Sequence, residues 1–367
     1  MRGFAVVVMV IGHSIDSVLS PAARSTELFR LYDAVRGFTA PMFLFVSGFA
    51  FAVVVMRRWN DHVSFGSPAR KRLSKMLMLL GLGYALHFPF FSLNKLLHDM
   101  KPEEFAMMAQ VDILHCLAVS IILLQLVVVF TRTPGRFAAV TAGLTTAIIV
   151  VSPLVWQSDL SGVVTPFFAP YFNQKVPSLF PVFPFAAYLF TGSVIGILYT
   201  LARQRGEEFL MLRQVLRVGV VFGLLGLVLD IAPVTIYPPH DFWKTSPNWF
   251  LMRIGIIASL TAGFFHIRNL PPVLARNLVT LGQASLVVYT VHLILVYGSA
   301  ANPGLMHIIG QHLDPAGAVV VAFGVLLLMI TLVHARNTMR EHHYYPLKIF
   351  QAGFTSTLLY FFLTKPY

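Results

Sequence analysis

The first apolar run of the chain contains three ionisable residues. The sequence RGFAVVVMVIGHSID at residues 2–16 places Arg2 at the start of the run, His13 eleven positions later and Asp16 three positions after the histidine. If the run is helical, His13 and Asp16 lie on the same face, within reach of a hydrogen bond. A carboxylate beside an imidazole fixes its tautomer and makes it more basic, as a general base requires. The pattern therefore predicts a catalytic His13 that is oriented by Asp16.

The depth of His13 in its run supports this interpretation. At about 1.5 Å per residue, its Cα lies ~16 Å along the helix from Arg2, near the middle of a bilayer. A charge at that depth costs at least ~2.5 kcal/mol, so an ionisable residue there favours a function. The structural alternative is a histidine that hydrogen-bonds a neighbouring helix and only holds a bundle together.

Composition decides which solvent surrounds this segment. The chain of 367 residues is 57% hydrophobic and 11% charged, with a mean hydropathy of +0.74. A soluble domain has about 25% charged residues, so the composition predicts an all-α, polytopic membrane bundle. Ten or eleven transmembrane helices are expected, at residues 3–20, 34–56, 73–92, 109–131, 136–155, 178–202, 214–232, 249–267, 277–299, 317–335 and, as the eleventh, 349–363. No soluble domain or long linker interrupts them, so we expect one integral membrane domain over residues 1–367. We interpret the first run as a retained helix, because His13 and Asp16 are foreign to a signal peptide.

The net charge of +12 is distributed unevenly over the loops. If the N-terminus is cytoplasmic, the inner loops hold most of the basic residues, for example at 57–72, whereas the loop at 300–316 has no lysine or arginine. This asymmetry follows the positive-inside rule and predicts a cytoplasmic N-terminus. We therefore expect the charge to face anionic lipid rather than nucleic acid, and an anionic substrate to approach from the cytoplasm.

Four segments resemble those of a known clan of membrane enzymes. RGFAVVVMVIGH at 2–13 is similar to the arginine and histidine signature of acyltransferase type 3 proteins, and three further segments agree in order: APMFLFVSGFAF, FPVFPFAAYLFTGSVIG and LGQASLVVYTVHLILVY. HDFWKTSPNWFLMRIG at 240–255 resembles the branch of heparan-α-glucosaminide N-acetyltransferase-like proteins. The resemblance covers most of the membrane domain.

The resemblance implies acyl transfer across the membrane. The donor would be a cytoplasmic acyl-CoA, with acetyl as the expected acyl group, and the acceptor a hydroxyl or amine, commonly of a glycan, on the outer side. His13 would be the essential histidine, acting as base or as acyl carrier, and Arg2 would bind the donor phosphates. Asp16 is outside the general signature, so its role depends on the helix geometry alone. Further substrate-binding groups are expected at Arg36, Ser47, Asp112, His115 and His292.

No metal is expected, and the sequence shows no phosphate-cradling glycine loop. The main alternative function is a proton-coupled transporter or flippase that uses His13 and Asp16 as a proton relay, and a further one is a catalytically inactive scaffold. We expect the bacterial inner membrane as the location, and a homodimer is compatible with the sequence. The acceptor, the acyl group and the choice between direct transfer and an acyl-histidine intermediate are left open by the sequence.

Overall fold

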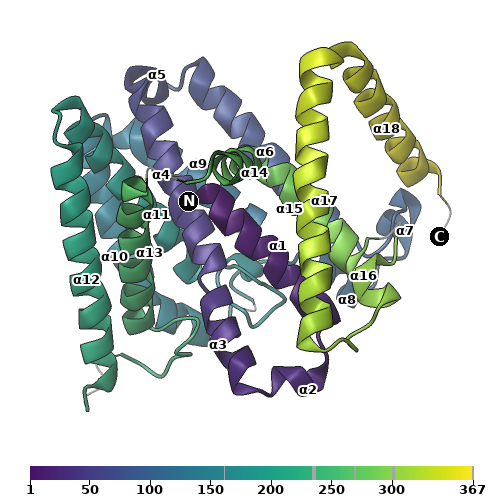
Figure 1. The fold of residues 1–367 in the computed structure, drawn as a ribbon, viewed down its shortest axis with the longest axis horizontal. Helices are drawn as coiled ribbons and strands as arrows, with labels where there is room; N and C mark the ends of the chain where they lie inside the picture. Colours follow the sequence, from purple (N-terminus) through teal and green to yellow (C-terminus); the bar gives the residue numbers. More distant parts are fainter. Residues whose placement is uncertain (161, 234–236, 268–269, 300–301, 366–367) are drawn as a thin grey trace. The chain divides into compact units, whose positions relative to one another are not determined.

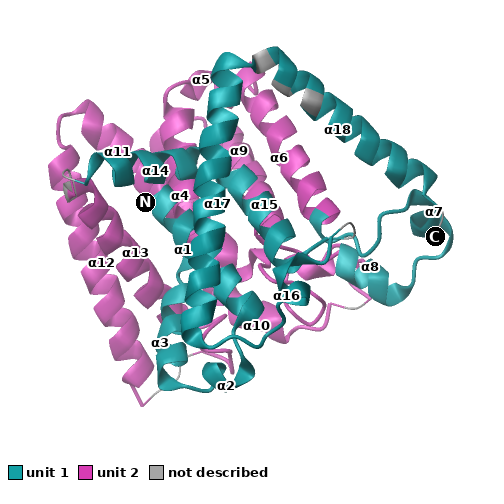
Figure 2. Ribbon diagram, turned by 45° about the vertical axis from the view of Figure 1, so that its right-hand side comes forward, with its two compact units in different colours: residues 1–39, 86–108, 270–367 teal, residues 40–85, 109–269 magenta. Residues whose placement is uncertain are grey.

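The computed structural model describes residues 1–160, 162–233, 237–267, 270–299 and 302–365. The described chain is helical, and its β-pairing is limited to isolated bridges such as Leu19 with Leu313. Contacts divide the chain into two compact units, each assembled from separate stretches of sequence (Figures 1 and 2). The first unit is residues 1–39, 86–108 and 270–367, and the second is residues 40–85 and 109–269. The expectation of one domain over 1–367 stays a prediction.

The first unit is organised around its N-terminal helix. Its helices are α1 (Arg2–Val18), α2 (Pro21–Arg24), α3 (Glu27–Arg36), α7 (Leu93–His98), α8 (Pro102–Met108), α14 (Pro272–Gln283), α15 (Ser285–Tyr297), α16 (Gly304–Ile308), α17 (Pro315–His342) and α18 (Tyr344–Thr364). Helix α1 packs against α14, α15 and α17. A Cβ at Gly3 would lie 1.8 Å from the carbonyl oxygen of Leu278, so only glycine permits this approach of α14.

The C-terminal half of α1 packs on α17. Ile15, Val18 and Leu19 form a buried cluster with Ala318 and Ala322. The backbone adds two hydrogen bonds, because Leu313 N donates to Val18 O and Ser20 N donates to Leu313 O. These contacts fix the end of α1 that carries His13 and Asp16.

The second unit is formed by helices from the middle of the chain. They are α4 (Thr39–Met56), α5 (Trp59–Val63), α6 (Ser67–Leu86), α9 (Ile113–Thr131), α10 (Pro134–Gln157), α11 (Val182–Gln204), α12 (Glu208–Ile231) and α13 (Pro247–His266), with a short 3₁₀ turn at Ala169–Tyr171. Helix α11 packs against α9, α10 and α12, and α12 pairs with α13 along its length. Side chains such as Phe45, Leu189 and Phe190 are almost completely buried and form the core of this unit.

The helix lengths confirm a polytopic membrane bundle but give fewer spans than expected. Among the described residues, seven helices are long and apolar enough to cross a membrane, or eight if α14 and α15 are one span. The expectation of ten or eleven was therefore too high by this measure. The helices at the expected spans 3–20, 73–92 and 349–363 are not among the seven. Helix α1 has 17 residues, short of the ~20 that a bilayer needs, and α6 begins with a cluster of cations.

The expected span at 277–299 is a broken helix. Helices α14 and α15 meet at an angle of 83°, and Ala284 lies between them. The break gives α15 its own N-terminus, at Ser285, inside the expected span. The side of the membrane on which the N-terminus lies stays a prediction.

Candidate active site

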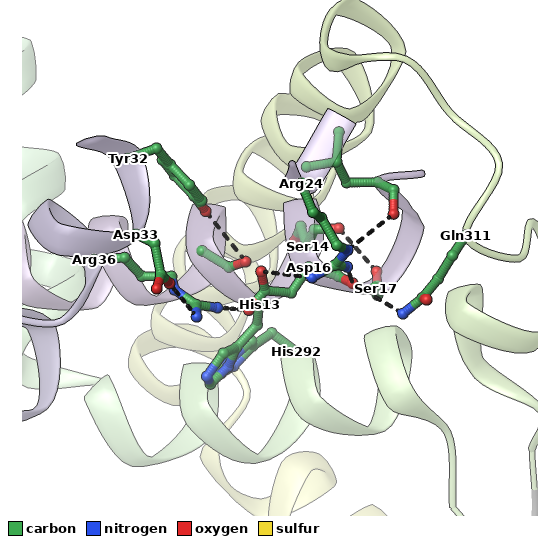
Figure 3. A network of polar contacts seen from close by, with 12 residues as sticks. His13, Ser14, Asp16, Ser17, Arg24, Tyr32, Asp33, Arg36, His292 and Gln311 are labelled. Carbon is green, nitrogen blue, oxygen red and sulfur yellow. Dashed lines mark hydrogen bonds and ion pairs between the residues drawn. The ribbon is translucent and has the colours of Figure 1, made fainter. Parts of the chain in front are cut away.

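His13 and His292 meet between α1 and α15, within the first unit (Figure 3). Nδ1 of His13 lies 2.9 Å from Nε2 of His292. The two rings are nearly parallel, with an interplanar angle of 10° and centroids 5.2 Å apart. The residues that the sequence predicts as the essential histidine and as a substrate-binding group are therefore direct partners.

The backbone of α15 fixes the direction of this hydrogen bond. Nδ1 of His292 lies 2.6 Å from the carbonyl oxygen of Val288, which can only accept. Nδ1 of a neutral His292 therefore carries the proton, and its Nε2 is the acceptor. His13 must then donate from Nδ1, which leaves Nε2 of His13 with a free lone pair.

The two histidines differ in burial. His292 is completely buried, whereas His13 is partly exposed. The ring of Tyr297 approaches His13 edge-on, with centroids 5.7 Å apart. The buried ring of His292 orients the partly exposed ring of His13, whose Nε2 has a free lone pair. A general base or nucleophile needs this arrangement.

Arg36 lies across α1 beside this pair. A Cβ at Gly12 would come within 3.3 Å of Cγ and Cδ of Arg36, so the glycine makes room for the arginine stem. Helix α3 is joined to α1 at the same level, because the Tyr32 hydroxyl donates to the Gly12 carbonyl at 3.4 Å. Arg36 also donates to Asp33 Oδ1, at 2.6 Å from Nη2. The expected substrate-binding Arg36 is thus held beside His13.

Asp16 does not pair with His13, and this expectation was wrong. Its carboxylate forms an ion pair with Arg36, and Arg24 Nη1 lies 3.8 Å from Oδ1 (Figure 3). Guanidinium groups compete better than a neutral imidazole for a carboxylate, because both partners are charged. Arg24 also donates to the backbone oxygens of Asp16 and Leu19 at the end of α1, where the last carbonyls lack a partner within the helix. The ring of His13 is oriented by His292 instead.

Arg2 lies at the other end of α1. Its Nη2 donates to the hydroxyl of Ser285 at 2.6 Å, at the start of α15. The eleven-residue spacing therefore separates Arg2 from His13 along the helix, as the sequence predicts. Its role in binding donor phosphates stays a prediction.

Three other predicted site residues lie in the second unit. Ser47 is buried, and its hydroxyl donates to Phe43 O, one turn earlier in α4. Asp112 is the N-cap of α9 and accepts from the backbone of Leu114 and His115. Asp112 N in turn donates to His115 Nδ1 at 3.2 Å, which completes a capping box, and the two side chains approach to 2.7 Å. These contacts account for local structure, and the assignment of the three residues to substrate binding stays a prediction.

The structure adds Arg24, Tyr32 and Tyr297 to the site, which the sequence interpretation missed. Arg24 and Tyr32 lie outside the apolar core of the first expected spans, where polar residues are usually solvated. Tyr297 lies five residues after His292 in the segment LGQASLVVYTVHLILVY, and that proximity was the available signal. Among the described residues, no group of three or more His, Cys, Asp or Glu side chains is placed to hold a metal ion.

The fold and the site together define a class: a helical membrane protein with an oriented histidine on its first helix. Over residues 1–228 the chain matches the family described as heparan-alpha-glucosaminide N-acetyltransferase, catalytic. The match covers more than half of the chain, which therefore belongs to this family of membrane acetyltransferases. No curated protein matches the chain. The matched region includes α1 with Arg2 and His13, whereas His292 lies beyond it.

Proposed function

We propose that the chain is an acetyl-CoA-dependent membrane acetyltransferase. It moves an acetyl group from cytoplasmic acetyl-CoA to a hydroxyl or amine, most suitably of a glycan, on the outer side of a bacterial inner membrane. The observation that carries this proposal is the hydrogen-bond sequence from Val288 O through His292 to His13, because it leaves Nε2 of His13 able to accept a proton. The family match supports the acetyl group and the enzyme class.

In direct transfer, His13 acts as a general base. Its Nε2 takes the proton of the acceptor while the acceptor oxygen or nitrogen attacks the thioester carbonyl. The C–S bond then breaks, and the departing thiolate of CoA takes the proton from Nε2. His292 accepts the Nδ1 hydrogen bond throughout, so it stabilises the imidazolium that forms in between.

In a stepwise route, Nε2 of His13 attacks the thioester carbonyl itself. The C–S bond breaks, the thiolate of CoA leaves, and the Nδ1 proton of His13 moves to Nε2 of His292. A neutral acetylimidazole remains for the acceptor to attack. The same hydrogen bond supports both routes, so the pair accounts for transfer without deciding between them.

The experiment that tests this function replaces His13 in the full chain, purified and reconstituted in vesicles. We expect His13→Ala to lower acetyl transfer from acetyl-CoA to a glucosamine-containing acceptor by about 10²–10⁴-fold, the usual contribution of a positioned base. His307→Ala is the matched control, because His307 is exposed on α16 of the same unit. Equal transfer by the two variants would refute the proposal. Retained acetyl-CoA turnover with loss of proton-coupled flux would instead favour a transporter.

A second experiment addresses the donor side. If Arg2 binds the phosphates of CoA, Arg2→Gln raises the KM for acetyl-CoA by about tenfold, the loss of one charge-assisted hydrogen bond. Arg2→Lys restores only part of this affinity, because lysine lacks the two-pronged guanidinium. An unchanged KM in both variants would refute a role of Arg2 in binding the donor phosphates.

A further inference from the structure

A cavity of about 340 Å³ in the second unit is lined by an unusual set of side chains. It lies where α4 ends, α5 follows and α6 begins. Its cations are Arg57, Arg58, Lys71, Arg72 and Lys75, and its other lining residues are Val54, His62, Pro68 and Met76. The lining has no carboxylate, and none of the five cations forms an ion pair with a carboxylate among the described residues. Five positive charges around one cavity repel one another, and a bound anion would offset this repulsion.

Arg72 is the most constrained of these cations. Its guanidinium carbon lies 4.6 Å from the centroid of the Phe51 ring, and its Nη1 is buried without a hydrogen-bond partner in the described chain. A buried donor without an acceptor is destabilising. The rest of the half-buried Arg72 side chain lines the cavity, where an anion would offset the charge of the guanidinium.

The start of α6 adds to the positive field of the cavity, whereas His62 forms part of its wall. The buried His62 is clamped to α9, because its Nδ1 donates to Gln125 Oε1 at 2.9 Å and Gln125 Nε2 donates to His62 O at 3.1 Å. Burial lowers the pKa of His62, and the positive charge of Arg72 lowers it further. Helix α6 begins at Ser67, and Pro68 in its first turn lines the cavity, so the positive end of the helix dipole lies at the cavity. No acidic residue in this turn offsets that positive end.

Apolar side chains continue from the cations along α6. Met78, which follows Lys75 by three residues on the same face of α6, is 55% exposed, and Val54, which lines the cavity, is 49% exposed. Cations followed by exposed apolar residues match the order of parts in a phospholipid, with its phosphate at the membrane surface and its acyl chains deeper.

We propose that this cavity is a phosphate site occupied by the headgroup of an anionic phospholipid. The headgroup phosphate accepts from Arg72 and its neighbouring cations, and the acyl chains lie along Val54 and Met78. The site is independent of the transfer chemistry at His13, because it needs no acetyl donor or acceptor.

The test measures phospholipid retained by the purified full chain. Protein extracted from vesicles of phosphatidylcholine and phosphatidylglycerol is analysed for bound phosphatidylglycerol by native mass spectrometry. We expect Arg72→Gln to lower the apparent affinity about fivefold, the effect of one cation at an anionic surface. Arg70→Gln is the matched control, because Arg70 is exposed and adjacent in sequence but does not line the cavity. Lys71→Gln with Lys75→Gln, at two exposed positions, tests the site without disturbing the half-buried Arg72.

Two results would overturn the proposal. Equal loss in Arg70→Gln and Arg72→Gln would show that diffuse surface charge, and not the cavity, holds the lipid. The second result uses adenosine 3′,5′-bisphosphate as a soluble probe. If this probe raises the Tm of the wild type but not of Arg72→Gln, while phosphatidylglycerol retention is equal, the cavity binds a soluble phosphate ligand instead.

Discussion

Two histidines in this molecule stand three residues from an aspartate, and the two regions use that spacing differently. In the second unit, Asp112 precedes His115, and the pair forms the capping box of α9, in which His115 N donates to Asp112 Oδ1 at 3.1 Å and Asp112 N donates to His115 Nδ1 at 3.2 Å. In the first unit, Asp16 follows His13, and the two side chains take different partners. The comparison shows that equal spacing does not ensure equal pairing, because the place of the residues within the helix decides.

The physical reason lies in the backbone of each helix. Asp112 is at an N-terminus, where unpaired N–H groups attract a carboxylate and hold it against the next turn. Asp16 is near a C-terminus, where unpaired carbonyls attract arginines. Arg24 and Arg36 therefore gather at Asp16 and leave His13 to a partner from another helix. That partner, His292, accepts from Nδ1 of His13 and so leaves the lone pair on Nε2 of His13 free.

The largest expected effect that would sharpen this comparison comes from His292. We expect His292→Ala to lower kcat by about 10²-fold, because His13 loses the group that fixes its tautomer. His292→Gln should recover part of that rate, since its side-chain oxygen can accept from Nδ1 of His13. The measurement is kcat and KM for acetyl-CoA in vesicles. A change in KM with unchanged kcat would show that His292 has only a packing role. Equal kcat values for His292→Ala and His292→Gln would show the same.

A smaller effect is expected at Asp16. Because its carboxylate contacts arginines and not His13, Asp16→Asn should lower activity less than His292→Ala does. Its effect on Tm should be non-additive with Arg36→Gln, since both changes break the same ion pair. A double-mutant cycle measured by thermal unfolding checks this. Coupling of Asp16→Asn to His13→Ala in kcat, without coupling to Arg36→Gln in Tm, would restore the histidine–aspartate interpretation.

The smallest expected effect concerns the cap of α9. Asp112→Ala should lower the free energy of unfolding by about 1 kcal/mol, the usual loss for an N-cap, with kcat unchanged. Asp112→Asn should recover most of that stability, because asparagine caps nearly as well. Denaturant unfolding and acceptor kinetics measure the two quantities. A raised acceptor KM at unchanged stability would favour the substrate-binding role that the sequence predicts for this residue.

The sequence predicted those features that follow from local pattern. Apolar runs predicted the helical membrane bundle, and the spacing of Arg2 and His13 placed them at separate positions along α1. It could not predict the break at Ala284, because an apolar run does not reveal a bend of 83°. Nor could it reveal which helix lies against His13, since the partner is 279 residues away and only tertiary packing brings it there.

That distance along the chain also has a consequence for biosynthesis. At about 5–20 residues per second, the ribosome needs roughly 14–56 s to travel from His13 to His292. During that interval α1 has left the ribosome, whereas α14, α15 and α17, its packing partners, have not been made. Arg24 and Arg36 arrive within about five seconds of Asp16, so they can neutralise its charge early. The ion pairs at the end of α1 thus compensate the charge of Asp16 during the interval before the last part of the chain is made and completes the site.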